Sequence, residues 1–278
     1  MTLAALDARF PNRRAVITGG ASGLGLAAAE LLAARGWQLA LLDRDEPRLA
    51  SAAEALRALG SPHCEGFAVD TTDEAAVKFA VDAFAGRLGG IDLALNSAGV
   101  AAAGGLNETP SADWRWILEI NVLGVVHSCR AEAPHMVVAG RGLIVNVASA
   151  AAFMSAPAMG AYNASKAAVV ALSETLQHEL AADGVQVAVA MPGFFRTRLM
   201  EHARAPADAR AFAERLMDRS SMAASDVASE ILARAAAGET HLVLPASYRW
   251  LWRFKRLAPR SFMRWLARQR WRRPSQGG

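Results

Sequence analysis

Residues 14–25, RAVITGGASGLG, decide the fold, because a short apolar run leads there directly into a glycine-rich turn. The Ala/Leu-rich residues 24–35 follow and predict a helix, so the turn joins a buried strand to a helix. Glycine permits tight turns and close approach of the backbone to a ligand, and the unpaired amides at a helix start favour an anion. The spacing is Gly19-x3-Gly23-x-Gly25. This arrangement predicts a site for the pyrophosphate of a dinucleotide.

The same alternation of strand and helix continues along the chain. Short apolar runs predict strands at residues 14–18, 38–43, 66–70, 91–96, 143–147 and 185–191, and Ala/Leu-rich stretches predict helices at 24–35, 46–59, 73–88, 111–138 and 161–183. The strands lack strict polar–apolar alternation, as expected when helices cover both faces of a sheet. We therefore predict an α/β fold with a doubly wound, Rossmann-type parallel sheet. Residues 1–244 form its single domain, and residues 245–278 form a C-terminal tail.

Composition excludes several classes of protein. The chain has 278 residues, 53% of them hydrophobic, which is ample for a core and excludes a disordered protein. Two cysteines, Cys64 and Cys129, exclude a disulfide scaffold and a cysteine-based zinc module, and the six histidines show no ligand spacing, so no metal is expected. Residues 1–14 lack a signal peptide's apolar stretch, and the charge-free residues 142–165 contain too many polar groups for a membrane span. We expect a cytoplasmic protein.

Two acidic residues follow predicted strands where a dinucleotide's adenosine would lie. Asp43 ends the second strand, 18 residues after Gly25, close to where an acid meets the ribose hydroxyls. A carboxylate there favours NAD because it would repel the 2′-phosphate of NADP. Arg44 follows directly and could receive that phosphate, so NADP stays the less favoured alternative. Asp70 ends the third strand and could accept a hydrogen bond from the adenine amino group.

A tyrosine and a lysine stand four residues apart at a predicted helix start. Tyr162 and Lys166 would share a helix face, which brings the ammonium near the phenol. A phenol titrates at about 10 in water, and lowering its pKa to about 7 takes some 4 kcal/mol of preference for the phenolate. An adjacent cation and a helix N-terminus act in that direction. Ser149, 13 residues before Tyr162, follows a buried strand and could hydrogen-bond a substrate oxygen.

Taken together, these motifs resemble those of the short-chain dehydrogenase/reductase family over about residues 13–244. The resemblance rests on the glycine-rich turn, on Asn96-Ser97-Ala98-Gly99 (with serine at the second position, where the family has asparagine), and on Asn121, Ser149, Tyr162 and Lys166 in order and spacing. Pro192-Gly193 with Thr197 resembles the segment that meets the nicotinamide carboxamide. The resemblance implies that Tyr162 is the general acid/base, Lys166 lowers its pKa and holds the nicotinamide ribose, Ser149 orients the carbonyl, and Asn121 anchors a water of the proton relay. It also implies a homodimer or homotetramer that uses helices 111–138 and 161–183.

The expected cofactor-binding set combines both lines of argument. It comprises Gly19, Ala21, Ser22, Gly23, Leu24, Gly25, Asp43, Arg44, Asp70, Thr71, Asn96, Ala98, Gly99, Tyr162, Lys166, Pro192, Gly193, Phe195 and Thr197.

The expected substrate pocket is apolar. Its candidate lining is Phe153, Met154, Met159, Phe194 and Leu199, which suits a lipophilic alcohol or ketone of steroid, retinoid or fatty type better than a sugar. The structural alternative is that half of these side chains pack in the core or an interface. The expected reaction is hydride transfer between NAD(H) and a secondary alcohol or ketone. The alternative is a non-catalytic, NAD(P)-binding redox-sensing or scaffold protein recruited to membranes by its tail.

The tail carries a different composition from the rest of the chain. Residues 245–278 hold ten of the 30 Lys/Arg, none of the 26 Asp/Glu and four of the seven Trp, Trp271 included. Arginines recur every three or four residues, and Leu251, Phe254, Ala258, Met263 and Leu266 mark an apolar side. Pro259 is expected to divide two helices. Such a segment is typical of an interfacial membrane anchor, with peripheral contact through residues 247–273; the alternative is an extension docked on the acidic body. Nucleic acid is not an expected partner.

Overall fold

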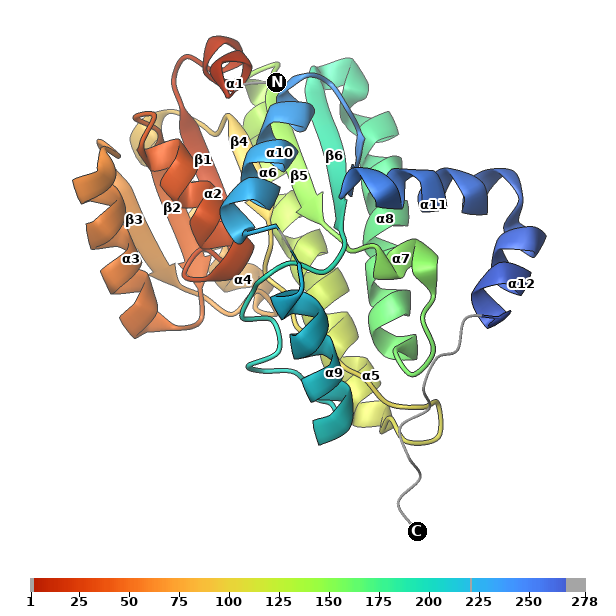
Figure 1. The fold of residues 1–278 in the computed structure, drawn as a ribbon. Coiled ribbons are helices and arrows are strands. Elements are labelled where there is room, and N and C mark those ends of the chain that lie inside the picture. The colour runs from red at the N-terminus through yellow and green to blue at the C-terminus, as the bar shows by residue number, and fades with distance from the viewer. Residues whose placement is uncertain (1–2, 221, 269–278) are drawn as a thin grey trace.

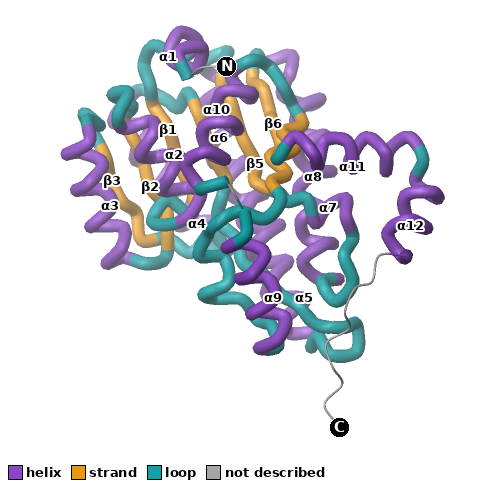
Figure 2. Tube along the Cα trace, viewed as in Figure 1, coloured by secondary structure: helices purple, strands orange, loops and turns teal. Residues whose placement is uncertain are grey.

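A single parallel sheet organises the protein. The computed structural model describes residues 3–220 and 222–268. Its seven strands lie in the order β3-β2-β1-β4-β5-β6-β7, and all neighbours pair in parallel. Figure 2 shows the strands in orange, with helices beside them. The strands are β1 (Arg14–Thr18), β2 (Gln38–Asp43), β3 (Cys64–Ala68), β4 (Leu93–Asn96), β5 (Gly142–Val147), β6 (Val185–Pro192) and β7 (His241–Leu244). The order reverses between β1 and β4, and ligands bind outside the carboxyl ends of strands at such a point.

Helices cover both faces of the sheet, so the predicted doubly wound fold is confirmed (Figure 1). Successive strand residues point to opposite faces: Ile17 packs in the cluster with α2, α3 and α10, and Val16 packs in the cluster with α4, α6 and α8. The helices are α1 (Ala4–Arg9), α2 (Gly23–Ala33), α3 (Glu46–Leu59), α4 (Glu74–Leu88), α5 (Ser111–Leu118), α6 (Gly124–Val138), α7 (Ala151–Met154), α8 (Gly160–Leu180), α9 (Ala207–Asp218), α10 (Ala224–Ala236), α11 (Ala246–Leu257) and α12 (Pro259–Arg268).

Several element boundaries differ from the sequence prediction. β3 begins at Cys64, two residues before the predicted start, because Cys64 pairs with Leu39 at the edge of the sheet. The predicted helix 111–138 is interrupted by a π-helical turn, η1 (Glu119–Leu123), and the last residues of the predicted helix 161–183 form a 3₁₀ turn, η2 (Ala181–Asp183). The strand β7 and helices α9 and α10 were not predicted. β7 is only four residues long, which leaves too little pattern to recognise.

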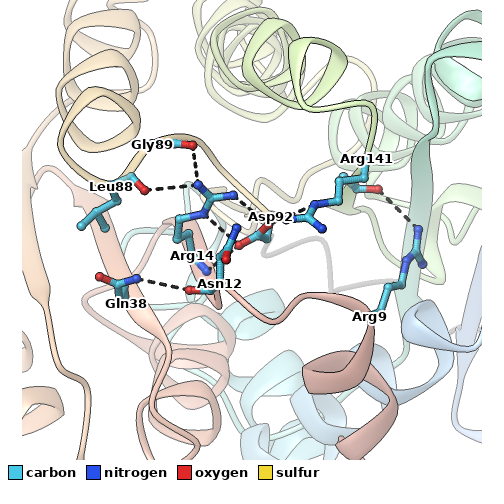
Figure 3. A network of polar contacts seen from close by, with 9 residues as sticks. Arg9, Asn12, Arg14, Gln38, Leu88, Gly89, Asp92 and Arg141 are labelled. Atoms are coloured by element: carbon cyan, nitrogen blue, oxygen red, sulfur yellow. Dashed lines mark hydrogen bonds and ion pairs between the residues drawn. The ribbon is translucent and has the colours of Figure 1, made fainter.

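A buried ion pair fixes the amino edge of the sheet, at the end opposite the predicted site. Arg14 begins β1 and Asp92 precedes β4; the Arg14 guanidinium donates to both Asp92 carboxylate oxygens, at 2.9 and 3.0 Å (Figure 3). Arg14 also donates to the carbonyl oxygens of Leu88 and Gly89. Asp92 is fully buried, so this pair joins two central strands where solvent cannot replace either partner.

The described part of the tail forms two helices that leave the far edge of the sheet (Figure 1). The division at Pro259 is as predicted. Tyr248, Leu251 and Trp252 pack against the body, whereas Phe262 and Leu266 are the buried side chains of α12. Met263, which was expected on the apolar side, is 48% exposed. Residues 269–273, Trp271 included, belong to the segment for which membrane contact is expected, and they lie outside the described residues. The division of the chain into a domain and a tail stays a prediction.

Candidate active site

The glycine-rich turn between β1 and α2 leaves room that a side chain would fill. A Cβ on Gly25 would lie 2.3 Å from the Gly19 carbonyl oxygen, and one on Gly19, at φ +67°, would lie 2.9 Å from the Ala98 amide nitrogen. Gly23 has φ +55° and lies beside the Thr197 hydroxyl. These positions require glycine, and they form the close-fitting backbone cradle that a pyrophosphate needs.

The start of α2 offers free backbone amides beside this cradle. Ser22 precedes the helix with extended backbone, its side chain caps no amide, and the first turn contains no acidic residue. The amides of Ser22 and Gly23 can therefore receive an anion. Leu24 is 7% exposed and packs in the core, so only its backbone belongs to the site.

Asp43 lies where the sequence predicts it, at the end of β2 and against the glycine-rich turn. Its carboxylate accepts hydrogen bonds from the Ala21 amide at 3.1 Å and the Asp45 amide at 3.2 Å. Arg44 is exposed beside it. The carboxylate thus stands next to the cradle, and the guanidinium is free to reorient in solvent.

Asp70 lies outside the strand that the sequence predicts it to end. β3 ends at Ala68, so Asp70 lies beyond the strand, is exposed, and accepts hydrogen bonds from the amide and hydroxyl of Thr72 at 2.9 and 2.8 Å. Thr71 is buried with its hydroxyl against Gly124, where α6 begins. Both residues follow β3, which pairs with β2 at the edge of the sheet and is separated by β2 from the strand that leads into the cradle.

The segment from Asn96 to Gly99 joins β4 to the neighbouring strands and to α6. The Asn96 amide nitrogen donates to Asn146 and Glu132, each at 3.0 Å, in the buried layer between the sheet and α6. Ser97 donates to the Thr18 carbonyl oxygen at 2.6 Å and so ties β4 to β1. The two Asn96 contacts and a third, to the Cys129 sulfur at 3.6 Å, all lie in the core; cofactor binding by Asn96 stays a prediction.

Three predicted catalytic side chains converge where β5 ends and α8 begins. Tyr162 and Lys166 lie one turn apart on α8 and are 6% and 5% exposed. Ser149, just after β5, forms a side-chain hydrogen bond with Tyr162. The Lys166 ammonium lies 5.9 Å from the centre of the Tyr162 ring and donates to the Val147 carbonyl oxygen at 3.0 Å. A hydroxyl pair is thus presented next to an ammonium at the carboxyl edge of the sheet.

The pKa of Tyr162 is shifted in the direction opposite to the one that the sequence predicts. Burial raises the pKa of Tyr162, which the hydrogen bond from Ser149 opposes, and burial lowers the pKa of Lys166 to about 8. The four-residue spacing alone predicts the opposite, that Lys166 lowers the pKa of Tyr162. Desolvation prevails here because the ammonium faces the Val147 carbonyl rather than the phenol oxygen. A protonated phenol is suited to donate a proton to a carbonyl oxygen.

Asn121 owes its position to the π-helical turn η1. It is fully buried; its side-chain oxygen accepts from the Val100 amide at 2.8 Å, and its amide nitrogen donates to Val100 and Ser165. A Cβ on Gly99 would lie 3.1 Å from the Asn121 side-chain oxygen and 3.3 Å from the Lys166 side-chain nitrogen. Both polar atoms therefore lie next to Gly99. π turns are frequent at functional sites. Nothing in the sequence around Asn121 indicated such a turn.

The segment after β6 closes the site on the other side. The Pro192 carbonyl oxygen accepts from the Ala150 amide at 2.8 Å, which holds this segment against the residue after Ser149. Thr197 lies beside Gly23 of the glycine-rich turn, and Phe195 packs against the core cluster that includes α2. Residues far apart in sequence thus meet around one edge.

The expected substrate residues fall into two groups. Met159 and Leu199 pack in the cluster that contains Tyr162, and Phe194 is 38% exposed. Phe153 and Met154 instead pack in the core cluster that contacts the tail, and Phe153 is 6% exposed. This packing is what the structural alternative describes, and the substrate role of these two residues stays a prediction.

The sequence analysis missed part of the apolar wall near Tyr162. Trp114 and Trp116 of α5 pack in the same cluster, together with Met217 of α9. Arg204 stacks over Trp116 at 4.1 Å and pairs with Asp113 at 2.7 Å, which links the segment before α9 to α5. The two tryptophans at the start of a predicted helix were the available signal.

Residues 3–220 and 222–268 contain neither a metal-binding cluster nor a membrane-spanning helix. Within those residues, no three His, Cys, Asp or Glu side chains are grouped to hold a metal ion. No helix among them has the length and apolarity needed to cross a bilayer.

Comparisons with known proteins identify the family of this chain. The family model for short chain dehydrogenases matches residues 13–208. The chain is 34% identical over 200 residues to 2-(R)-hydroxypropyl-CoM dehydrogenase of Xanthobacter autotrophicus (68% of this chain, 77% of that one) and 40% identical over 196 residues to D-threitol dehydrogenase of Mycolicibacterium smegmatis (69% and 74%). A crystal structure of a short-chain dehydrogenase/reductase from Burkholderia phymatum in complex with NAD is similar with a TM-score of 0.81 and 35% identity, covering 88% of this chain and 94% of that one. The protein belongs to the short-chain dehydrogenase/reductase family and is an oxidoreductase.

Proposed function

We propose that the protein transfers a hydride between NAD(H) and a lipophilic secondary alcohol or ketone. The observation that carries this proposal is the convergence of Ser149, Tyr162 and Lys166, with the Lys166 ammonium beside Gly99, at the edge that also holds the glycine-rich turn. Bound NAD would supply the hydride chemistry, and the cradle made by Gly19 and Gly25 suits its pyrophosphate.

Each side chain has a distinct task in this reaction. Tyr162 donates its hydroxyl proton to the carbonyl oxygen during reduction, or accepts the alcohol proton during oxidation. Ser149 hydrogen-bonds the same substrate oxygen and orients it. Lys166 provides positive charge near the phenol and a donor for the nicotinamide ribose, and Asn121 fixes the backbone of Val100 at the border of the site.

NAD is preferred over NADP because of Asp43. Its carboxylate borders the cradle and would repel a 2′-phosphate, whereas it can accept hydrogen bonds from ribose hydroxyls. Initial rates with NAD and NADP test this. Asp43→Ser should reduce the preference for NAD, because the repulsion is lost while Arg44 remains available for the phosphate. An unchanged preference would reject this role.

The apolar wall around Tyr162 supports a lipophilic substrate. Met159, Leu199, Trp114 and Trp116 supply surface that gains from burying hydrocarbon, and a polyol would leave its hydroxyls there without partners. A panel of long-chain and cyclic secondary alcohols, assayed beside threitol-like polyols by NADH absorbance, tests this. The proposal predicts a higher kcat/KM for the hydrophobic members; a preference for polyols would contradict it.

The alternative is a non-catalytic protein that senses or scaffolds through bound NAD(P). It predicts binding of the dinucleotide without turnover of any alcohol or ketone in the panel. The hydrogen-bonded Tyr162 and Ser149 argue against it, because binding alone does not require a hydroxyl pair next to an ammonium. Under the preferred function, Tyr162→Phe abolishes turnover.

We also propose a cytoplasmic homodimer or homotetramer. Free, buried Cys64 and Cys129 suit a reducing compartment. Among the helices proposed for the interface, α5 and η1 expose Leu118 and Leu123, at 37% and 41%, and apolar surface of this kind favours association. Light scattering of Leu118→Asp and Leu123→Asp variants should show a smaller particle than the parent; an unchanged mass would reject this interface.

The outer face of the tail supports peripheral contact with an anionic membrane surface. Trp250 and Leu257 of α11 and Met263 of α12 are 63%, 85% and 48% exposed. Residues 246–268 carry seven basic side chains and no acidic one. Exposed aromatic and aliphatic groups among cations favour an interface of anionic headgroups.

Vesicle co-sedimentation tests the membrane contact. The full chain should bind vesicles that contain phosphatidylglycerol and not pure phosphatidylcholine, and the double variant Trp250→Ser/Leu257→Ser should bind less. The matched control is Phe79→Ser, which removes a 72% exposed aromatic from α4. Equal sedimentation of all three proteins would refute the contact.

A further inference from the structure

Helix α11 is joined to the short helix that follows the catalytic serine. The Lys255 ammonium donates to the Phe153 carbonyl oxygen at 2.7 Å and to the Ser155 hydroxyl at 3.3 Å. Phe153 lies in the last turn of α7, and Ser155 ends that helix with φ +53°. The last carbonyls of a helix have no partner within it, so a lysine from a distant part of the chain satisfies the end of α7.

The other end of α7 holds Ser149. The Ala151 amide donates to the Ser149 hydroxyl oxygen at 3.2 Å, and the Ala152 amide donates to the Ser149 carbonyl oxygen at 3.0 Å. The Ala150 amide is bound to Pro192 at the end of β6. α7 is only four residues long, so a displacement of its last turn also shifts the amide that orients the Ser149 hydroxyl.

A second contact attaches α11 to the segment after β6. A Cβ on Gly193 would lie 3.0 Å from Cζ of the Tyr248 ring, so the phenol packs directly on this glycine. The Gly193 amide donates to the Leu244 carbonyl oxygen at 2.8 Å, immediately before α11. One helix therefore contacts both segments that flank the proposed substrate site.

We propose that Lys255 is a positioning residue, which holds α7 so that the Ser149 hydroxyl meets the substrate oxygen; this inference rests on the proposed function. Lys255 is partly buried, and its ammonium also lies 6.0 Å from the centre of the Phe262 ring, which joins α12 to the same point. Loss of the ammonium frees the end of α7 and reduces productive binding of the alcohol or ketone, whereas the glycine-rich turn lies elsewhere and keeps its affinity for NAD.

The test compares Lys255→Met with Lys255→Arg, which keeps a donor, and with Lys78→Met as the matched control. Lys78 is exposed on α4 and pairs with Asp82 on the same helix. Two quantities are measured on the full chain: hydrogen exchange of the backbone amides of residues 150–155, and KM and kcat for the best alcohol of the panel with the Kd for NAD.

In Lys255→Met we expect exchange in residues 150–155 to rise about tenfold, equivalent to about 1.4 kcal/mol, and kcat/KM for the alcohol to fall by a similar factor. The Kd for NAD stays the same. In Lys255→Arg, the exchange of residues 150–155 and kcat/KM should both lie close to the parent values, and in Lys78→Met both should equal them. Unchanged exchange at residues 150–155 overturns the inference, and so does a loss of NAD affinity with faster exchange throughout the chain. Absence of turnover in the parent protein would reject the proposed function, and the exchange result would still decide whether Lys255 holds α7.

Discussion

Replacing Lys166 by methionine should stabilise the fold while it abolishes catalysis. Burial lowers the pKa of Lys166 from 10.5 to about 8, which corresponds to a cost of about 3 kcal/mol for keeping the ammonium in the folded state at neutral pH. Methionine fills a similar volume without the charge. Loss of the hydrogen bond to Val147 lowers the expected gain in stability by about 1 kcal/mol. We expect Lys166→Met to be about 2 kcal/mol more stable at pH 7.

The dependence of this difference on pH follows from the direction of the pKa shift. Between pH 8 and 10.5 the unfolded chain keeps the lysine proton that the folded chain releases, so the stability of the parent rises with pH in this window. The variant lacks that rise, and its advantage should shrink above pH 8. Urea unfolding is followed by tryptophan fluorescence at pH 7, 8 and 9.5, at one protein concentration. It measures the difference in unfolding free energy between variant and parent at pH 7 and the change of this difference with pH. A variant that is less stable at pH 7, or an advantage that stays constant to pH 9.5, would refute the reasoning.

Three further changes probe the core, the amino edge and the cradle. Burial raises the pKa of Glu132 to about 7, so stability should fall as pH rises from 4.5 to 7; Glu132→Gln should remove that fall and gain about 2 kcal/mol at pH 8, as seen in urea titrations. Arg14→Met removes the guanidinium that binds both Asp92 oxygens and leaves the buried carboxylate with Arg141 at 4.0 Å, so it should cost about 3–5 kcal/mol by the same measurement. Gly25→Ala places a methyl group against Gly19 and should weaken NAD binding at least roughly tenfold in calorimetry while circular dichroism stays unchanged; unaltered affinity would count against the cradle.

The parallel sheet was predictable because its signals are local. Buried parallel strands are continuous apolar runs, and the glycines of the first turn are needed where backbone meets backbone. The pairing of Tyr162 with Lys166 on one helix face also follows from spacing alone. The family and the enzyme class, which rested on these motifs, are confirmed.

Other features depend on contacts between distant segments, which a single sequence does not reveal. The π turn places Asn121 against Val100, 21 residues away, and Phe153 packs in a core cluster with residues of distant helices and strands. The pKa of Tyr162 depends on what faces its oxygen: spacing put an ammonium nearby, but burial and the orientation of Lys166 toward Val147 decide the direction. The cofactor and substrate residues stay predictions.

The central claim is that Tyr162 exchanges a proton with a substrate whose carbon exchanges a hydride with NAD. The most direct measurement uses a secondary alcohol deuterated at its carbinol carbon and follows the label by mass spectrometry of the reduced cofactor. We predict that the parent protein yields deuterated NADH, whereas Tyr162→Phe binds NAD with the same Kd and yields none. Label in the cofactor of the Tyr162→Phe variant, formed at the parent's rate, would contradict the account.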